Sequence, residues 1–132
     1  MSDSEDLVNK DWLRKTWIFE EYKELNDLYV VYSNIESIEN ALVLFFEGCE
    51  CIYKRSKKKE KTKERIIKEF SYYKNQLECW ETIARNSMRK INSNKEVDKE
   101  YKKESKRVFL GIKEYIAKVN KEMDDFEKRF ES

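Results

Sequence analysis

The amino-acid sequence predicts an all-α fold, most simply an antiparallel four-helix bundle. The chain contains no proline and only two glycines, and proline is the residue that most strongly interrupts a helix. Apolar residues recur at alternating spacings of three and four, which places them on one face of a helix. Lysine, glutamate and leucine, which favour helices, fill many of the remaining positions. We expect helices over residues 8–32, 34–54, 62–91 and 95–130.

The first expected helix, residues 8–32, is defined by aromatic and aliphatic residues at spacings of four and three. Trp12 and Phe19 flank this face. Residues 28–32 are β-prone locally, but they continue the same helical phase, so we expect them to remain helical. The face consists of Ile18, Tyr22, Leu25, Tyr29 and Tyr32.

The second expected helix, residues 34–54, follows a capping-box pattern at Ser33 and Glu36. The serine oxygen can accept from the amide three residues on, and the glutamate can bond back to the serine amide. Val43, Leu44 and Phe46 widen the apolar arc beyond half of the circumference, which is typical of a central helix covered on two sides. The main face consists of Ile35, Ile38, Leu42, Phe45, Cys49 and Ile52.

The last two expected helices carry longer apolar stripes, separated by an Asn-Ser-Asn turn at residues 92–94. The stripe in residues 62–91 follows an almost unbroken heptad pattern. It consists of Ile66, Phe70, Tyr73, Leu77, Trp80, Ala84, Met88 and Ile91. The stripe in residues 95–130 consists of Val97, Tyr101, Val108, Ile112, Tyr115, Val119, Met123, Phe126 and Phe130.

The connection between the second and third helices leaves another architecture open. Ile52 and Ile66 lie fourteen residues apart, which is two heptads, and no glycine or proline lies between them. Residues 34–91 could therefore form one long helix in an elongated three-helix coiled-coil rod that dimerises to cover its stripe. Average helix length favours the compact bundle. Because the stripes are long in either case, we expect a homo-oligomer or a protein partner.

The sequence predicts one domain preceded by a short acidic segment. We expect residues 1–7 to be a disordered acidic N-terminus and residues 8–132 to form a single helical-bundle domain. The longest apolar run, residues 41–46, is far shorter than the ~20 residues that cross a bilayer, and the acidic start does not resemble a signal peptide. The three cysteines fit no disulfide or zinc pattern, which favours reduced, mostly buried thiols. We therefore expect an intracellular protein, cytoplasmic or nuclear, with no transmembrane segment.

Acidic side chains predominate in the first part of the sequence and basic side chains in the second. Residues 1–53 hold 4 basic and 12 acidic side chains, and residues 54–132 hold 24 basic and 15 acidic ones. Their net charges of −8 and +9 either neutralise each other when the two parts pack or present a field to a partner.

The absence of histidine from the chain excludes several kinds of catalytic site. Serine or cysteine nucleophiles activated by histidine cannot form, nor can zinc sites of the His-Glu-x-x-His type. The two glycines are isolated, so no glycine-rich phosphate loop is present. We expect no catalytic residues, no metal site and no cofactor.

Paired glutamates leave one catalytic alternative, a Mg²⁺-dependent all-α nucleotide pyrophosphatase. Such enzymes hold Mg²⁺ between carboxylates spaced three residues apart on adjacent helices. Glutamate is abundant here, and acidic residues are common near the start of a helix, so we prefer a solvated surface for these side chains. Three of the four such pairs in the sequence are candidates: Glu21 with Glu24, Glu36 with Glu39, and Glu47 with Glu50.

A basic run at residues 54–65 is the strongest positive indication of a binding site. Eight cations and two acidic residues fall within twelve positions, which creates a field that phosphates or acidic proteins would feel. Most aromatic residues lie in the apolar stripes and are expected in the core rather than as stacking platforms for bases. The candidate anion- or nucleic-acid-binding residues are Lys54, Arg55, Lys57, Lys58, Lys59, Lys61, Lys63 and Arg65.

The function that the sequence predicts is a non-catalytic helical protein–protein interaction module, such as an adaptor, an inhibitor or an assembly subunit. Binding of nucleic acid or of an anionic membrane surface through residues 54–65 is the first alternative, and the pyrophosphatase is the second.

Overall fold

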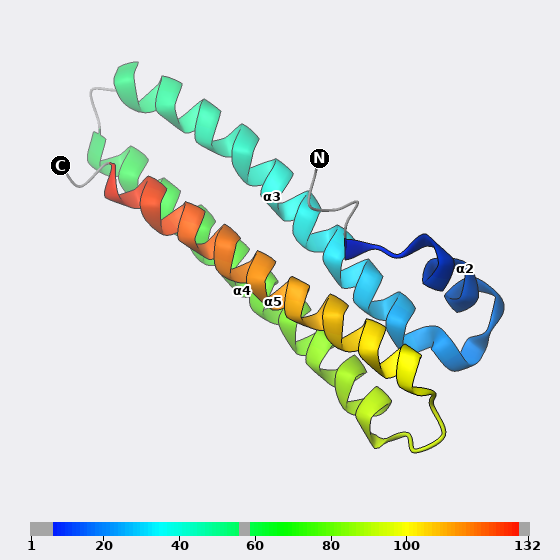
Figure 1. The fold of residues 1–132 in the computed structure, drawn as a ribbon. Helices are drawn as coiled ribbons and strands as arrows, with labels where there is room; N and C mark the ends of the chain where they lie inside the picture. The colour runs from blue at the N-terminus through cyan, green and yellow to red at the C-terminus, as the bar shows by residue number, and fades with distance from the viewer. Residues whose placement is uncertain (1–6, 56–58, 130–132) are drawn as a thin grey trace.

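The computed structural model describes residues 7–55 and 59–129, which are almost entirely helical (Figure 1). Four helices pack together: α2 (Lys10–Ile18), α3 (Lys23–Arg55), α4 (Lys59–Ser93) and α5 (Lys99–Lys128). A short 3-10 turn, η1 (Glu20–Tyr22), joins α2 to α3. The predicted all-α helical bundle is confirmed.

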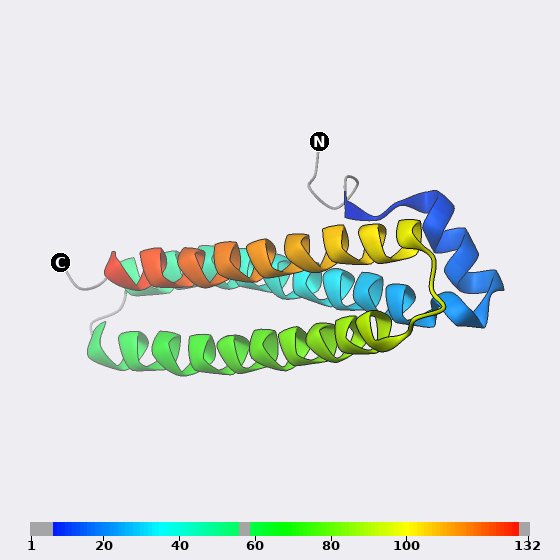
Figure 2. The same ribbon diagram turned by 60° about the horizontal axis from the view of Figure 1, so that its bottom comes forward.

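The three long helices run side by side in alternating directions, and α2 folds across one end of them (Figures 1 and 2). α3 packs against both α4 and α5, which also pack against each other. The acidic α3 therefore lies beside two basic helices. Ion pairs join α5 to α3 at Lys118–Glu39 (3.6 Å) and, from the residue that follows α5, at Arg129–Glu50 (2.7 Å).

The helix boundary predicted at Ser33 is wrong, because α3 continues through it without interruption. Asn34 Nδ2 donates to the carbonyl of Val30 (2.8 Å), and Ser37 Oγ donates to the carbonyl of Ser33 (3.2 Å). These polar side chains bond back onto their own helix instead of capping a new one. The buried stripe on either side keeps one helical phase, so burial favours continuation over the local capping signal.

The chain instead breaks at Phe19, inside the helix predicted for residues 8–32. Phe19 is extended (φ −112°, ψ 116°), with α2 before it and η1 after it. This break lets Trp12 turn back onto Tyr22 (5.4 Å between ring centroids) and Tyr101 (5.8 Å). The Tyr101 hydroxyl also accepts from the Leu25 amide (3.3 Å), which satisfies a donor in the first turn of α3. The break is therefore set by tertiary packing.

The single long helix over residues 34–91 is not formed. α3 ends at Arg55, α4 begins at Lys59, and the two helices pack against each other in opposite directions. α5 begins after Asp98, whose carboxylate accepts from the Tyr101 amide (2.7 Å). An aspartate in this position is a favourable N-cap.

The predicted apolar stripes of α4 and α5 form the core, with half-buried Tyr73, Trp80 and Tyr115 at its edge and Phe130 outside the described residues. An aromatic cluster closes the core toward the α3–α4 connection. Phe46 stacks on Phe126 with ring centroids 4.4 Å apart, and Phe70 meets both of them edge-on. Burying such large side chains is the main source of stability of the bundle.

Several predictions about burial are wrong. Ile18 and Ile52, which were expected on the apolar faces of their helices, are 66% and 58% exposed. α3 is not covered on both sides, because Val43 and Leu44 are exposed. Of the three cysteines, only Cys49 is buried, while Cys51 and Cys79 are exposed. α4 and α5 cover only part of the circumference of α3 around Val43 and Leu44, so one side of its apolar arc stays open there. No helix within residues 7–55 and 59–129 is long and apolar enough to cross a membrane.

Candidate interaction surface

An apolar groove lies between the end of α3 and the beginning of α4, with a volume of about 300 Å³. We call it the α3–α4 groove. Leu44 and Ile52 line it although they are 70% and 58% exposed. Gly48 adds no side chain, and a Cβ atom built on it would meet nothing within 4 Å. The complete lining is Leu44, Phe45, Gly48, Cys49, Ile52, Thr62, Arg65 and Ile66.

The described basic residues of the predicted binding site lie at the same end of the bundle as this groove. Lys54 and Arg55 end α3, and four more cations occupy the first two turns of α4. Arg65 itself lines the groove, and Lys59 Nζ lies 5.3 Å from the centroid of the Tyr53 ring. The two helices therefore bring together Lys54, Arg55, Lys59, Lys61, Lys63 and Arg65; Lys57 and Lys58 lie outside the residues that the structure describes.

Cys49 forms part of the groove wall. Burial raises the pKa of its thiol, and the neighbouring Arg65 guanidinium offsets only part of this effect. A raised pKa keeps the thiol protonated, and the thiol is much less reactive than the thiolate. The groove thus offers apolar contact and positive charge, which is a combination suited to binding.

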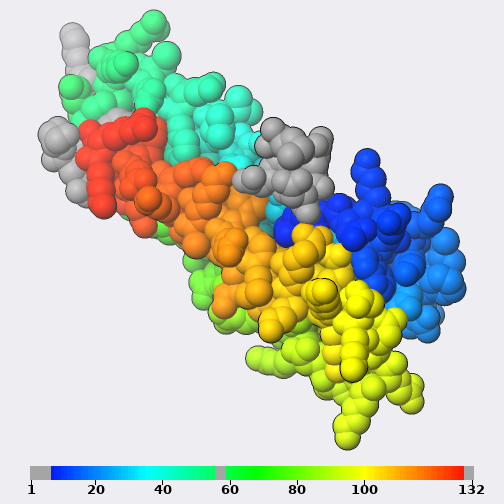
Figure 3. Space-filling view, in the orientation of Figure 1, coloured from blue at the N-terminus to red at the C-terminus, as the bar shows by residue number. Residues whose placement is uncertain are grey.

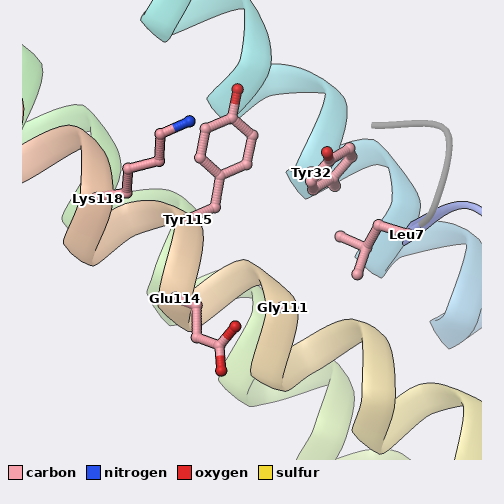
Figure 4. Close-up of a pocket in the computed structure, with 6 residues that line it drawn as sticks. All are labelled: Leu7, Tyr32, Gly111, Glu114, Tyr115 and Lys118. Atoms are coloured by element: carbon pink, nitrogen blue, oxygen red, sulfur yellow. The ribbon is translucent and has the colours of Figure 1, made fainter. Parts of the chain in front are cut away.

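A second hollow, of about 320 Å³, lies over α5 and α3 and is shown in Figure 4. Tyr115 points from α5 toward α3, where its hydroxyl donates to Glu39 Oε1 (2.6 Å). Burial and the Glu39 carboxylate raise the pKa of Tyr115, and Lys118 pairs with the other oxygen of Glu39. Glu39 on α3 thus accepts a hydrogen bond from Tyr115 and forms an ion pair with Lys118, and both interactions link α3 to α5.

Glu122 completes this polar seam. Burial is the largest cause of its raised pKa, the Glu39 carboxylate raises it further, and Lys118 lowers it. A carboxyl group that is partly buried beside a second carboxylate is more easily protonated than usual, and this describes Glu122.

The amino-terminal end of the described chain is held on α5 by contacts that the sequence analysis missed. Leu7 packs on Gly111, where a Cβ atom would overlap the leucine side chain. Arg107 donates to the Leu7 carbonyl (2.6 Å) and pairs with the buried Glu104, which also accepts from Asn9 (3.2 Å). A glycine and a carboxylate on the inner face of a helix are the sequence signals that could have indicated this contact.

The glutamate pairs do not face one another across adjacent helices. Glu24, Glu36 and Glu47 all lie on α3, and twelve residues of helix separate the first two by about 18 Å. Within the described ranges, no cluster of three or more acidic, cysteine or histidine side chains is placed to hold a metal ion.

A second group of exposed apolar side chains lies where α2 meets η1. Figures 1 and 3 show this part of the chain at the opposite end of the bundle from the end of α3. We call residues 17–21 the α2–η1 corner. Trp17 is 80% exposed and Ile18 66%. Phe19 is also exposed, and the two residues that follow it are the exposed Glu20 and Glu21.

Neither the protein-family models nor the curated proteins nor the solved structures with which the chain was compared give a match.

Proposed function

We propose that this chain is a non-catalytic protein–protein interaction module that binds an acidic segment bearing large apolar side chains. The observation that carries the proposal is the α3–α4 groove, where Leu44 and Ile52 stay exposed, Arg65 forms part of the wall, and five more basic residues lie at the same end of the bundle. Contiguous apolar surface with a charged rim is typical of interaction sites. Apolar side chains would enter the groove, and carboxylates would meet the cations around it.

The groove also distinguishes this function from binding of nucleic acid or anionic membranes. Phosphates would be held by the cations alone, and their affinity would fall steeply with salt. An acidic protein segment would depend on the apolar groove as well, and its apolar contribution would persist when salt screens the charges.

The test uses a fluorescein-labelled synthetic peptide that presents leucines on one helical face and glutamates elsewhere. Anisotropy titrations at low and high salt compare it with a scrambled peptide of equal composition, a single-stranded RNA and phosphatidylserine vesicles. We expect the protein to prefer the patterned peptide over the scrambled one at both salt concentrations. Equal binding of the two peptides, or binding of RNA or vesicles alone, would contradict the proposal.

Gly48→Met blocks the groove while preserving the fold, because nothing lies near the new Cβ and methionine favours a helix. We expect at least a tenfold loss of affinity for the patterned peptide. Ala41→Met is the matched control, since Ala41 is an exposed residue one heptad earlier on α3 and outside the groove. Helical circular dichroism and melting should be similar for both variants.

A further inference from the structure

We propose that the segment received by the α3–α4 groove is the α2–η1 corner of a second copy of this chain, which makes the protein a head-to-tail assembly unit. This inference rests on the proposed function of the groove and names its partner. It draws on one further surface, the α2–η1 corner.

The corner has the chemistry that the groove requires. Trp17 and Ile18 are the two most exposed large apolar side chains outside the groove region, and they adjoin the acidic side chains of Glu20 and Glu21. The groove presents the complement, with Leu44 and Ile52 open and Arg65 on its wall. The corner therefore offers exposed apolar and acidic side chains, and the groove offers exposed apolar side chains and a basic one.

α2 packs against the bundle through its inner face, so the α2–η1 corner on its outer side remains accessible to another molecule. Trp12 of α2 turns inward onto Tyr22 and Tyr101, and Thr16 is buried. Trp17 and Ile18 follow on the outer side, and the extended Phe19 directs the chain away into η1. The corner therefore protrudes from a helix that is itself anchored.

A molecule cannot fill its own groove with its own corner. Residues 23–44 of α3 separate the two surfaces, which corresponds to about 32 Å of helix. Figure 1 shows α2 at the opposite end from the point where α3 ends. Contact between two different surfaces of identical molecules is heterologous, so an array that does not close on itself keeps one corner and one groove unfilled for the next copy.

The test is sedimentation velocity of the full chain, from micromolar to millimolar protein, together with two non-associating variants. We expect the wild-type average mass to rise with concentration beyond that of a dimer. Trp17→Ser with Ile18→Ser removes the corner, and Gly48→Met blocks the groove; both substitutions lie at exposed positions. Each variant alone should remain monomeric, and an equimolar mixture should form a one-to-one pair that does not grow.

The mixture is decisive because only one intact corner and one intact groove remain in it. A wild type that stays monomeric, a mixture that stays monomeric, or a variant that associates as the wild type does would each overturn the inference. Patterned-peptide binding that is abolished by Gly48→Met in a protein that never self-associates would leave the proposed function standing and refute only the identity of the partner. A variant that combines Glu20→Lys with Glu21→Lys should also self-associate severalfold more weakly than the wild type at low salt.

Discussion

Gly48 and Gly111 both lie within helices, but a methyl group would meet different surroundings at the two positions. At Gly48 the space is open, whereas at Gly111 the Leu7 side chain already occupies it. We expect Gly48→Ala to raise the free energy of unfolding by about 1 kcal/mol, the usual helix-propensity difference between glycine and alanine. Urea denaturation measures the change.

Gly111→Ala is the comparison for that prediction. Its propensity gain should be offset by displacement of Leu7 from α5, so the net gain should be smaller than that of Gly48→Ala. A Gly48→Ala protein that is less stable than the wild type would show that the end of α3 packs more tightly than the structure indicates.

Glu122 gives the polar seam between α5 and α3 a dependence on pH. Its pKa is raised above its ordinary value of 4.5, so between 4.5 and the raised value the folded state binds more protons than the unfolded state. Stability is therefore lost as pH rises through that window. Glu122→Gln should stabilise the protein at pH 7 by less than ~1 kcal/mol, since the seam is partly solvated, and should flatten this pH dependence.

Denaturation midpoints measured from pH 4 to 7 test the prediction for Glu122. Glu114→Gln on the same helix is the control, because Glu114 is exposed. If both substitutions give the same pH profile, Glu122 is not the source of this pH dependence.

The element whose attachment is weakest is α2, a short helix that is anchored mainly through Trp12. We expect Trp12→Ala to release α2 from Tyr22 and Tyr101 at a cost of about 2 kcal/mol, while α3, α4 and α5 stay folded. Hydrogen exchange should then accelerate in residues 10–22 only. Trp17→Ala, which changes an exposed side chain of the same helix, should leave that exchange unaltered.

Long periodic elements were predictable, and their boundaries were predictable only in part. The stripes of α4 and α5 fall in the core because seven-residue periodicity over eight or nine positions admits few alternatives. The Ser33 capping pattern misled because a local signal competed with a continuous stripe. The break at Phe19 has no glycine or proline to mark it, since it depends on Trp12 meeting Tyr101 from another helix.

The candidate site was likewise predictable in composition and not in shape. The basic run at residues 54–65 can be recognised in the sequence alone, and its flexible, charged side chains are expected at the surface. Leu44 and Ile52 have the same chemistry as residues of the core, so the sequence does not reveal that they remain exposed. Which side of α3 stays open depends on how many helices surround it.

At the scale of the whole molecule, the basic end should attract acidic partners from a distance. Replacing Lys57, Lys58, Lys59 and Lys61 by glutamine should slow association with the patterned acidic peptide and reduce the salt dependence of its affinity. Stability should change by less than ~0.5 kcal/mol, as is usual for exposed charges. Stopped-flow anisotropy at two salt concentrations provides the measurement, and an unchanged association rate would exclude a role for these charges.

The uninterrupted course of α3 also sets a length. From Lys23, next to the α2–η1 corner, to Gly48 in the groove, the chain advances through a single helix that covers about 38 Å at 1.5 Å per residue. In a head-to-tail array, neighbouring molecules would be joined at the α2–η1 corner and the α3–α4 groove. Because a rigid helix links these two sites, their separation would set the repeat distance of the array. Concentrated solutions should therefore give an interference maximum in small-angle X-ray scattering near that spacing. Its position should stay constant as the array lengthens, while its intensity increases.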